Sequence, residues 1–226
     1  MDKRIHFLLA SLPLLQGVSA ADVAQILDHV GYELRNTTAG RRIILQGDTC
    51  QHLTFLVEGS LQADCRSADD RYTFTETLQA PLVVEPDVLY GIQRQYACTY
   101  TTTSDCVVLT LPKNDVNQML ASIEVFRLNY LNLLSTLAIR RREATQPQEG
   151  ASLRSRLIRF LANHASVPSG HKHFSIRMSD IGDYLGVSRV LVSDVLHELA
   201  TDQLLSIGRA GIEIPALERL VTDNKT

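Results

Sequence analysis

Four polar side chains and one valine recur at helical spacing in the last quarter of the 226-residue chain. Arg189, Val190, Ser193, Asp194 and His197 fall on one side of a predicted helix. A guanidinium binds guanine or phosphate through two hydrogen bonds, and a carboxylate accepts one from the amino group of cytosine. Valine offers only apolar contact, such as that to a thymine methyl group. These residue types therefore indicate contact with base edges rather than covalent catalysis.

The flanking residues predict the elements that position this helix. Ile181 and Leu185 are the inward positions of a shorter first helix, Gly186 can adopt the positive φ of a tight turn, and Ser188 caps the second helix. The inward side of the second helix comprises Val192, Val195, Leu196 and Leu199. Residues 204–207 and 212–214 then predict a β-hairpin, with Arg209 at its tip for a phosphate. This order is typical of a winged helix-turn-helix, whose second helix enters a major groove.

The charge of the chain excludes nucleic-acid binding through bulk charge, because the net charge is −3. Residues 151–226 hold 9 Lys and Arg against 8 Asp and Glu, whereas residues 1–150 hold 13 against 17. This asymmetry is small, so tight binding requires two copies and modest salt. The candidates for a local basic patch, each with ordinary surface charge as the alternative, are Arg154, Arg156, Arg159, Arg177, Arg189 and Arg209.

Short strands separated by turn residues fill the region from residue 36 to residue 111. Apolar runs at 43–45 and 53–57 end at Gly47-Asp48 and Glu58-Gly59, and further strands are predicted at 72–75, 96–103 and 106–111. Turn signals about every ten residues predict a β sandwich or barrel rather than βαβ units.

A long helix follows from residue 113, and its apolar residues lie on two sides. One coiled-coil-like seam runs through Phe126, Tyr130, Leu133 and Leu137, which we assign to a dimer interface. The other stripe is Leu128, Leu131, Leu134 and Ala138. A helix that is apolar on two faces must be covered twice, by its own β domain and by a second copy. Burial in one large monomer core is the alternative.

The whole chain resembles the Crp/Fnr superfamily of bacterial transcription regulators over residues 10–215. Its recognition helix begins with a segment like Gly186-Val187-Ser188-Arg189, and its β roll carries turns like residues 39–44, 46–48 and 55–59. Arg156 lies where the family keeps an arginine that opens the DNA-binding domain. The resemblance implies an α+β fold, in which a double-stranded β-helix (jelly roll) is joined by a long dimerisation helix to a winged helix-turn-helix.

The resemblance also implies domains and partners. We expect a β roll with an N-terminal helix at 1–112, a central helix at 113–146 and a DNA-binding domain at 147–226. The expected partners are double-stranded DNA, a second copy of the chain and RNA polymerase. Each subunit would read half of a near-palindromic site.

Two residues of the recognition helix depart from the family pattern. Val190 replaces a glutamate and Asp194 replaces an arginine. A carboxylate that faces the groove repels phosphates and can only accept hydrogen bonds. We therefore expect an operator that differs from the common family half-site, with Arg189 supplying the main guanine or phosphate contact.

The cyclic-nucleotide site that the family implies also departs from its pattern. Glu85 holds the position of the family glutamate, but Val84 replaces the preceding glycine, and Gln95-Tyr96 occupies the phosphate position with Arg94 one residue out of register. In a strand, a shift of one residue points a side chain to the opposite face. We do not expect cyclic AMP; the pocket holds another ligand, lined by Glu85, Arg94, Gln95 and Tyr96, or holds none.

Cofactors and enzyme activity find little support in the sequence. Cys50, Cys65, Cys98 and Cys106 form no CxxC pair and no zinc spacing, so we expect four buried thiols and no iron–sulfur cluster. His171 and His173 share a strand face, but no third metal ligand accompanies them. A haem needs an axial ligand, and the histidines that could provide one are isolated. We expect no metal and no enzyme: a cupin-type site needs clustered histidines, and the β roll offers only His52.

The N-terminus allows two interpretations. Residues 3–20 resemble a short secretory signal, but the apolar run is interrupted, and Ser19 is a plausible N-cap for a helix with Val23, Ile26, Leu27 and Val30 on one face. We prefer the helix and a cytoplasmic protein without membrane contact. A ligand-binding or interaction protein whose helix-turn-helix no longer reads DNA remains the alternative function.

Overall fold

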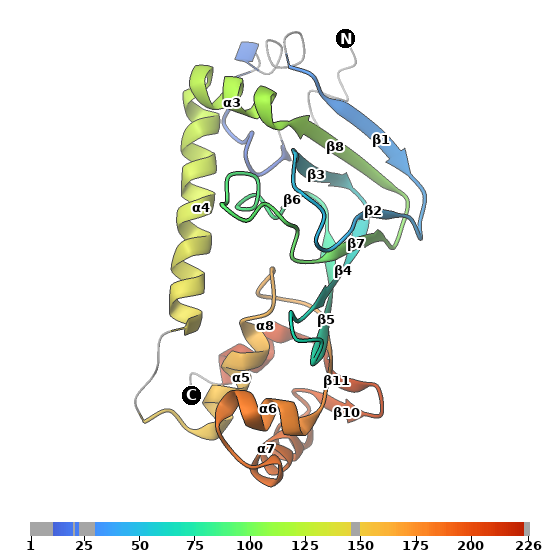
Figure 1. The fold of residues 1–226 in the computed structure, drawn as a ribbon, viewed down its shortest axis with the longest axis vertical. Coiled ribbons are helices and arrows are strands. Elements are labelled where there is room, and N and C mark those ends of the chain that lie inside the picture. The colour runs from blue at the N-terminus through green and yellow to red at the C-terminus, as the bar shows by residue number, and fades with distance from the viewer. Residues whose placement is uncertain (1–10, 20, 23–29, 146–149, 224–226) are drawn as a thin grey trace. The chain divides into compact units, whose positions relative to one another are not determined.

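The computed structural model describes residues 11–19, 21–22, 30–145 and 150–223. The chain forms two compact units (Figure 1). Unit 1 comprises residues 1–62 and 78–140, and unit 2 comprises residues 63–77 and 141–226. No helix among the residues described is long and apolar enough to cross a membrane.

Unit 1 is built mainly from antiparallel strands. A four-stranded sheet has the order β1-β8-β3-β6, and β2 pairs with β7 beside it. The central strand β3 pairs with β8 along one edge and with β6 along the other. Phe55 of β3, for example, lies opposite Leu109 of β8 and Val83 of β6. The strands are β1 (Glu33–Thr37), β2 (Arg42–Ile44), β3 (His52–Glu58), β6 (Leu82–Val84), β7 (Thr99–Thr102) and β8 (Cys106–Pro112), with β4 (Ser60–Arg66) running on into unit 2. The predicted α+β fold with a jelly-roll-like N-terminal domain is confirmed.

The N-terminal segment belongs to unit 1. Leu12, Leu14 and Leu15 are buried. The Ser19 hydroxyl accepts a hydrogen bond from the Asp22 backbone N–H at 3.1 Å, as an N-cap does. Val23, Ile26 and Leu27, which we expect on the apolar face of that helix, lie outside the described residues.

The cysteines follow the expectation only in part. Cys50 and Cys106 are buried free thiols. Cys65 and Cys98 are disulfide-bonded, so the expectation of four thiols is wrong for these two residues. Spacing along the chain could not show this, because neither residue belongs to a recognisable cysteine motif.

The predicted long helix is two helices, α3 (Lys113–Ser122) and α4 (Glu124–Thr145). Ile123 separates them with an extended backbone, φ −114° and ψ 101°. Two of the last carbonyls of α3 have partners there: the Ile123 N–H donates to Met119 O, and the Arg127 guanidinium donates to Leu120 O at 3.1 Å. No glycine or proline marks the break, so the apolar pattern continues across it.

Unit 2 contains the C-terminal helices and a strand pair from the first half of the chain (Figure 1). β5 (Tyr72–Gln79) pairs with β9 (Lys172–Ile176), and β9 pairs with β11 (Gly211–Ile214). β10 (Ser206–Gly208) and β11 form the predicted hairpin. Residues 63–77 therefore pack with the C-terminal region, although the expected boundaries place them in the N-terminal domain. The helices are α5 (Leu153–Ala162), α6 (Met178–Leu185), α7 (Arg189–Thr201) and α8 (Leu217–Asp223).

The junction between β5 and β9 contains a buried ion pair. Lys172 Nζ lies 2.9 Å from Glu76 Oε2, and both side chains are 0% exposed. The Glu76 carboxylate also accepts hydrogen bonds from the backbone N–H groups of Ser166 and Val167. Because every partner lies in unit 2, the hairpin of β4 and β5 is tied to the C-terminal helices by polar contacts as well as by strand pairing.

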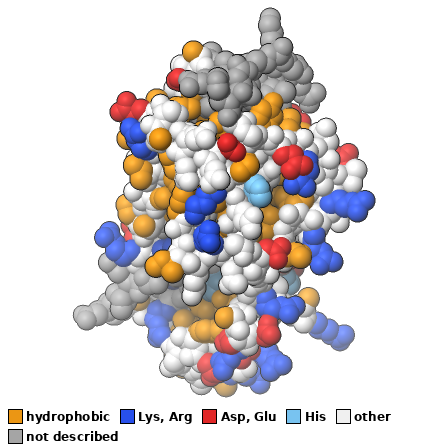
Figure 2. Space-filling view, turned by 45° about the horizontal axis from the view of Figure 1, so that its top comes forward, with side chains coloured by type: hydrophobic (Ala, Val, Ile, Leu, Met, Phe, Trp, Pro, Cys, Tyr) orange, Lys and Arg blue, Asp and Glu red, His pale blue; other side chains and the backbone are white. Residues whose placement is uncertain are grey.

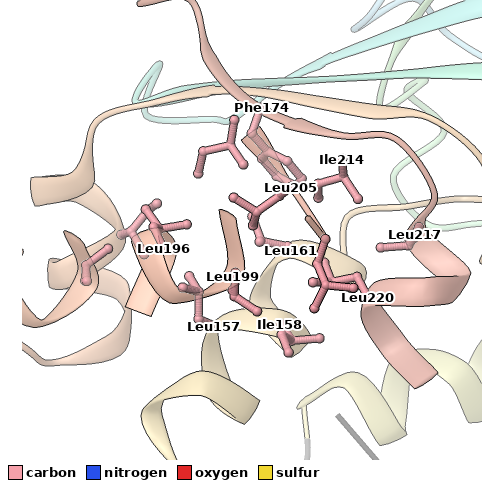
Figure 3. Close-up of a cluster of buried hydrophobic side chains, with 14 of the residues drawn as sticks. Leu157, Ile158, Leu161, Phe174, Leu196, Leu199, Leu205, Ile214, Leu217 and Leu220 are labelled. Atoms are coloured by element: carbon pink, nitrogen blue, oxygen red, sulfur yellow. The ribbon is translucent and has the colours of Figure 1, made fainter. Parts of the chain in front are cut away.

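The apolar core of unit 2 joins its helices to this sheet. Figure 3 shows leucines of α5, α7 and α8 pointing toward Phe174 of β9 and Ile214 of β11. These residues are fully or almost fully buried. The core fixes the inward side of α7, and therefore its outward side as well.

Candidate nucleic-acid interface

The turn between α6 and α7 has the predicted geometry. Gly186 ends α6 in the left-handed conformation, with φ 66° and ψ 37°. The Val187 N–H then donates to Gly182 O at 2.9 Å. A Cβ placed on Gly182 would lie 2.7 Å from Val187 O, so glycine is required at this close approach. Sequence reasoning missed Gly182, although a glycine inside a predicted helix is a signal for tight packing.

Two of the candidate patch arginines are used within unit 2. The Arg156 guanidinium donates to Leu185 O at the end of α6, and so supports the turn. Arg154 forms ion pairs with Asp202 and Asp223 at 2.8 and 2.7 Å. Both guanidinium groups therefore already have partners within unit 2, and a phosphate-binding patch that includes them stays a prediction.

The outward side of α7 carries the predicted contact residues. The Ser188 hydroxyl accepts from the Leu191 N–H and caps the helix. Arg189, Val190, Asp194 and His197 are exposed, and Ser193 is half-buried. Leu191, Glu198 and Thr201 are also exposed, which sequence reasoning did not include. Helical spacing alone places Leu191 at the flank of the outward side, so its exposure could have been expected.

Hydrogen bonds define the state of the imidazole on this surface. His197 Nδ1 lies 2.7 Å from Ser193 O, which can only accept, so Nδ1 is the protonated nitrogen. In the tautomer that carries its single proton on Nδ1, Nε2 is an acceptor. The Asp194 and Glu198 carboxylates are also exposed on α7, and Arg189 is the one arginine in α7, so negative side chains outnumber positive ones on this side.

The wing places Arg209 in the two-residue turn between β10 and β11, where its side chain is exposed. At the other end of β11, Glu213 lies between two histidines. Its carboxylate oxygens are 2.7 Å from His173 Nδ1 and 2.6 Å from His171 Nε2. The hydrogen bond between His173 and Glu213 therefore adds to the pairing of the wing strand with β9. Within the described residues, no group of three metal-ligating side chains could hold a metal ion.

Charged side chains of both signs lie side by side over unit 2. On the face shown in Figure 2, blue and red side chains are interspersed at the lower end of the view. The ion pairs of Arg154 and of Arg71, which lies 3.2 Å from Asp183, account for part of this mixture. Any affinity for a polyanion therefore depends on a few groups, with Arg189 and Arg209 foremost.

Two family models match the two parts of the chain. A Crp-like helix-turn-helix domain matches residues 155–222, which include α6, α7 and the wing. A cyclic nucleotide-binding domain matches residues 34–123, which include the β strands of unit 1. The chain belongs to the Crp/Fnr superfamily. No curated protein matches it.

Solved structures of Crp/Fnr proteins share the fold at low sequence identity. A Crp/Fnr-family regulator from Eubacterium rectale has a TM-score of 0.52 at 18% identity, with 96% of this chain and 99% of that chain covered. The sensor domain of the regulator DNR from Pseudomonas aeruginosa has the same TM-score and identity, with 66% and 97% covered. The Thermus thermophilus catabolite activator protein has a TM-score of 0.48 at 19% identity, with 94% and 97% covered.

The central helix of this Crp/Fnr protein buries one of its two apolar sides within unit 1. Phe126 and Tyr130 are 0% and 2% exposed, and the Tyr130 hydroxyl donates to Pro86 O at 2.5 Å. Assigning these two residues to a dimer interface is therefore wrong, because their own β roll covers them. Leu133 and Leu137 are half-buried, and their role stays a prediction. The exposed apolar side chains of α4 are Val125, Leu128, Leu131 and Ile139.

The four candidate effector residues have different environments. The Glu85 carboxylate accepts hydrogen bonds from Ala97 N, Cys98 N and the Tyr100 hydroxyl at 2.8, 3.1 and 2.9 Å. Burial raises the pKa of this carboxyl, and those hydrogen bonds oppose the shift. Tyr96 is buried, and its hydroxyl donates to His52 O at 3.3 Å. Arg94 and Gln95 are exposed.

Hydrogen bonds within the chain use most of the acceptor capacity of Glu85. Its two carboxylate oxygens already accept three hydrogen bonds from residues 97–100. These bonds use three of the about four acceptor sites of a carboxylate, so a ribose hydroxyl would find only one of them open. The carboxylate instead fastens the loop before β7 to the end of β6.

Proposed function

We propose that the protein is a homodimeric, sequence-specific DNA-binding transcription regulator of the cytoplasm, with no catalytic activity of its own. The observation that carries this proposal is the outward side of α7, where Arg189, Val190 and Asp194 are exposed beside a turn fixed by Gly182 and Gly186. N-terminal residues of a recognition helix contact base edges. Arg209 of the wing supports a contact to phosphate, and RNA polymerase is the proposed downstream partner.

The exposed apolar stripe of α4 supports homodimer formation. Leu128 and Leu131 are 49% and 52% exposed, one helical turn apart. A second copy of α4 would cover them and give two recognition helices for two half-sites. The dimer raises affinity without a strongly basic surface, since the phosphate contacts of both copies add.

We propose that the β roll holds no cyclic nucleotide, no metal and no other cofactor that its residues specify. The hydrogen bonds of Glu85 support this proposal. Two possibilities are compatible with it: the β roll binds an unidentified effector, or it serves only as a platform for the dimer. Mass spectrometry of small molecules that copurify with the native protein separates the two.

A second candidate is an interaction protein whose helix-turn-helix does not read DNA. The Asp194 and Glu198 carboxylates on the outward side of α7 favour it, because they repel phosphates.

Selection of binding sites from random DNA with the full chain tests the proposal. We expect a two-fold symmetric site that differs from the common family half-site, and affinity that falls steeply with salt. Enrichment of the common half-site would refute the altered specificity. Failure to enrich any sequence at low salt would refute DNA recognition and leave the second candidate.

A further inference from the structure

Exposed apolar side chains of unit 2 gather at its helix-turn-helix. Among the described residues of unit 2, the large apolar side chains that remain exposed are Tyr184, Val190 and Leu191. The Tyr184 hydroxyl donates to Asp69 Oδ2 at 3.1 Å, so this ring is held against the β4–β5 hairpin. Val190 and Leu191, which are 67% and 50% exposed, have no such role.

These two residues occupy the first turn of α7, directly after the Ser188 cap. The inward side of α7 consists of Val192, Leu196 and Leu199, which are all fully buried. The packing of α7 on the core of unit 2 therefore does not require the two apolar residues of its first turn. Val190 lies close to the centre of the outward side, near Asp194 and His197, and Leu191 lies at its flank. Consecutive helical residues differ by about 100° and 1.5 Å along the axis, so together they present a broad apolar edge.

We infer that Val190 and Leu191 read thymine methyl groups in the major groove. This inference rests on the proposed function and adds the chemistry by which the site selects its bases. The C5 methyl of thymine is the apolar group that unmodified base pairs present in the major groove, beside donors, acceptors and the small C5–H of cytosine. Contact between the apolar first turn of α7 and a thymine is therefore favourable. Opposite another base, the same apolar side chains would leave the donors and acceptors of that base without hydrogen-bond partners.

The polar neighbours on α7 support the same occupant. Asp194 and the Nε2 of His197 are acceptors, and they suit the amino groups of adenine or cytosine. An A·T pair offers an adenine amino group and a thymine methyl group on the same edge. The half-site should therefore place one or two thymines next to the bases that Asp194 and Arg189 contact.

Uracil substitution in selected DNA tests this inference, because deoxyuridine removes only the C5 methyl. The probes are duplexes that the full-length protein selects from random DNA, each with one thymine replaced by deoxyuridine. At a contacted thymine we expect affinity to fall about fourfold, the value of one buried methyl group. Substitutions outside the half-sites serve as the matched control.

The variants Val190→Ser and Leu191→Ser identify which residue makes the contact. Each should bind the thymine duplex about fourfold more weakly and should lose the difference between thymine and deoxyuridine at one position. Ile92→Ser, which alters an exposed apolar residue of unit 1, should change neither affinity nor discrimination. Both recognition variants should keep their affinity for unrelated DNA at low salt, which shows that they fold.

The outcomes separate this inference from the proposed function. If no deoxyuridine substitution in the selected sites changes the affinity, methyl recognition is overturned and DNA binding still stands. A deoxyuridine effect that persists unchanged in both serine variants also overturns it, because the methyl then acts through DNA shape. If no site is selected, the proposed function fails and this inference fails with it.

Discussion

At the scale of single residues, one position determines whether the helix-turn-helix can form, and another determines what it can bind. Gly182 permits the contact between α6 and the turn, and Asp194 places a negative charge on the surface that would face DNA. Both roles are local, so each can be tested by one substitution that leaves the rest of the chain unchanged.

Replacing Gly182 with alanine should destabilise unit 2. Alanine improves helix propensity by about 1 kcal/mol, but its Cβ would lie 2.7 Å from Val187 O, which is backbone and cannot rotate away. Overpacking of this kind costs about 1–3 kcal/mol, so after the gain in helix propensity we expect a net loss of up to about 2 kcal/mol in the free energy of unfolding. Urea denaturation measures it. Gly208→Ala is the matched control, because nothing lies within 4 Å of its Cβ position; equal stability of the two variants would contradict the argument.

Replacing Asp194 with asparagine should strengthen binding to DNA of unrelated sequence. The substitution removes a negative charge from an exposed position on α7 and keeps an acceptor oxygen. We expect an increase of a few-fold at low salt that shrinks as salt is raised, since screening weakens charge repulsion. Filter binding over a salt series measures this. Glu124→Gln, an exposed change in α4, should have no effect, and a decrease for the Asp194 variant would exclude repulsion at this site.

At the scale of secondary-structure elements, the pairing of β5 with β9 decides what the C-terminal unit contains. Three contacts join the β4–β5 hairpin to the winged helix. They are the strand pairing, the Glu76–Lys172 ion pair and the contact of Tyr72 with His164. The winged helix is therefore completed by residues 63–77.

Breaking the buried ion pair should unfold unit 2 more easily. Lys172→Met leaves the fully buried Glu76 carboxylate without its cation, which costs about 3–5 kcal/mol. The double variant Glu76→Gln with Lys172→Met should recover much of the loss, because the amide oxygen still accepts from Ser166 N. Urea denaturation gives the free energies. Arg35→Gln, which removes an exposed ion pair with Glu33, should cost less than about 1 kcal/mol; a similarly small loss for Lys172→Met would contradict this account.

Acid should weaken the same junction through His164. Burial lowers the pKa of this imidazole, while its hydrogen bond to Phe160 O opposes the shift. The unfolded chain therefore binds the proton first, and the stability that neutral His164 supplies is present above about pH 6.5 and declines as pH falls below it. The loss is at most about 1.4 kcal/mol per pH unit.

Urea denaturation at pH 7.5 and pH 5.5 measures this dependence. His164→Gln should show a smaller decrease between the two values than the native protein does. His52→Gln, at an exposed histidine of β3, should keep the native pH dependence. An identical dependence for all three proteins would show that His164 does not contribute.

At the scale of the whole molecule, the exposed side of α4 is the proposed interface between two copies. Replacing Leu128 and Leu131 with glutamate should convert the proposed dimer to a monomer, because buried like charges would face each other across the two-fold axis. Both side chains are about half exposed in the single chain, so its own stability should change little. Analytical ultracentrifugation measures the mass, and DNA affinity should fall with dimer loss. Ile92→Glu, at an exposed residue of unit 1, is the control; a dimeric double variant would place the interface elsewhere.

The helix-turn-helix, the wing and the succession of short strands could be predicted from the amino-acid sequence alone. These features depend on local rules: Gly186 permits a left-handed turn, Ser188 caps α7, and the spacing of Val192, Leu196 and Leu199 fixes its inward side. The exposure of Val190 and Asp194 follows from the same periodicity, so most of the candidate DNA-contacting surface could be predicted.

Three features depend on long-range packing and could not be predicted: which apolar side of α4 is buried, where the helix breaks and which strands complete the winged helix. Phe126 and Leu128 are equally apolar, so hydropathy could not tell the side that the β roll covers from the side left exposed. The break at Ile123 has no local marker. Glu76 and Lys172 lie 96 residues apart, and strand pairing over such a distance follows from the packing of the whole chain.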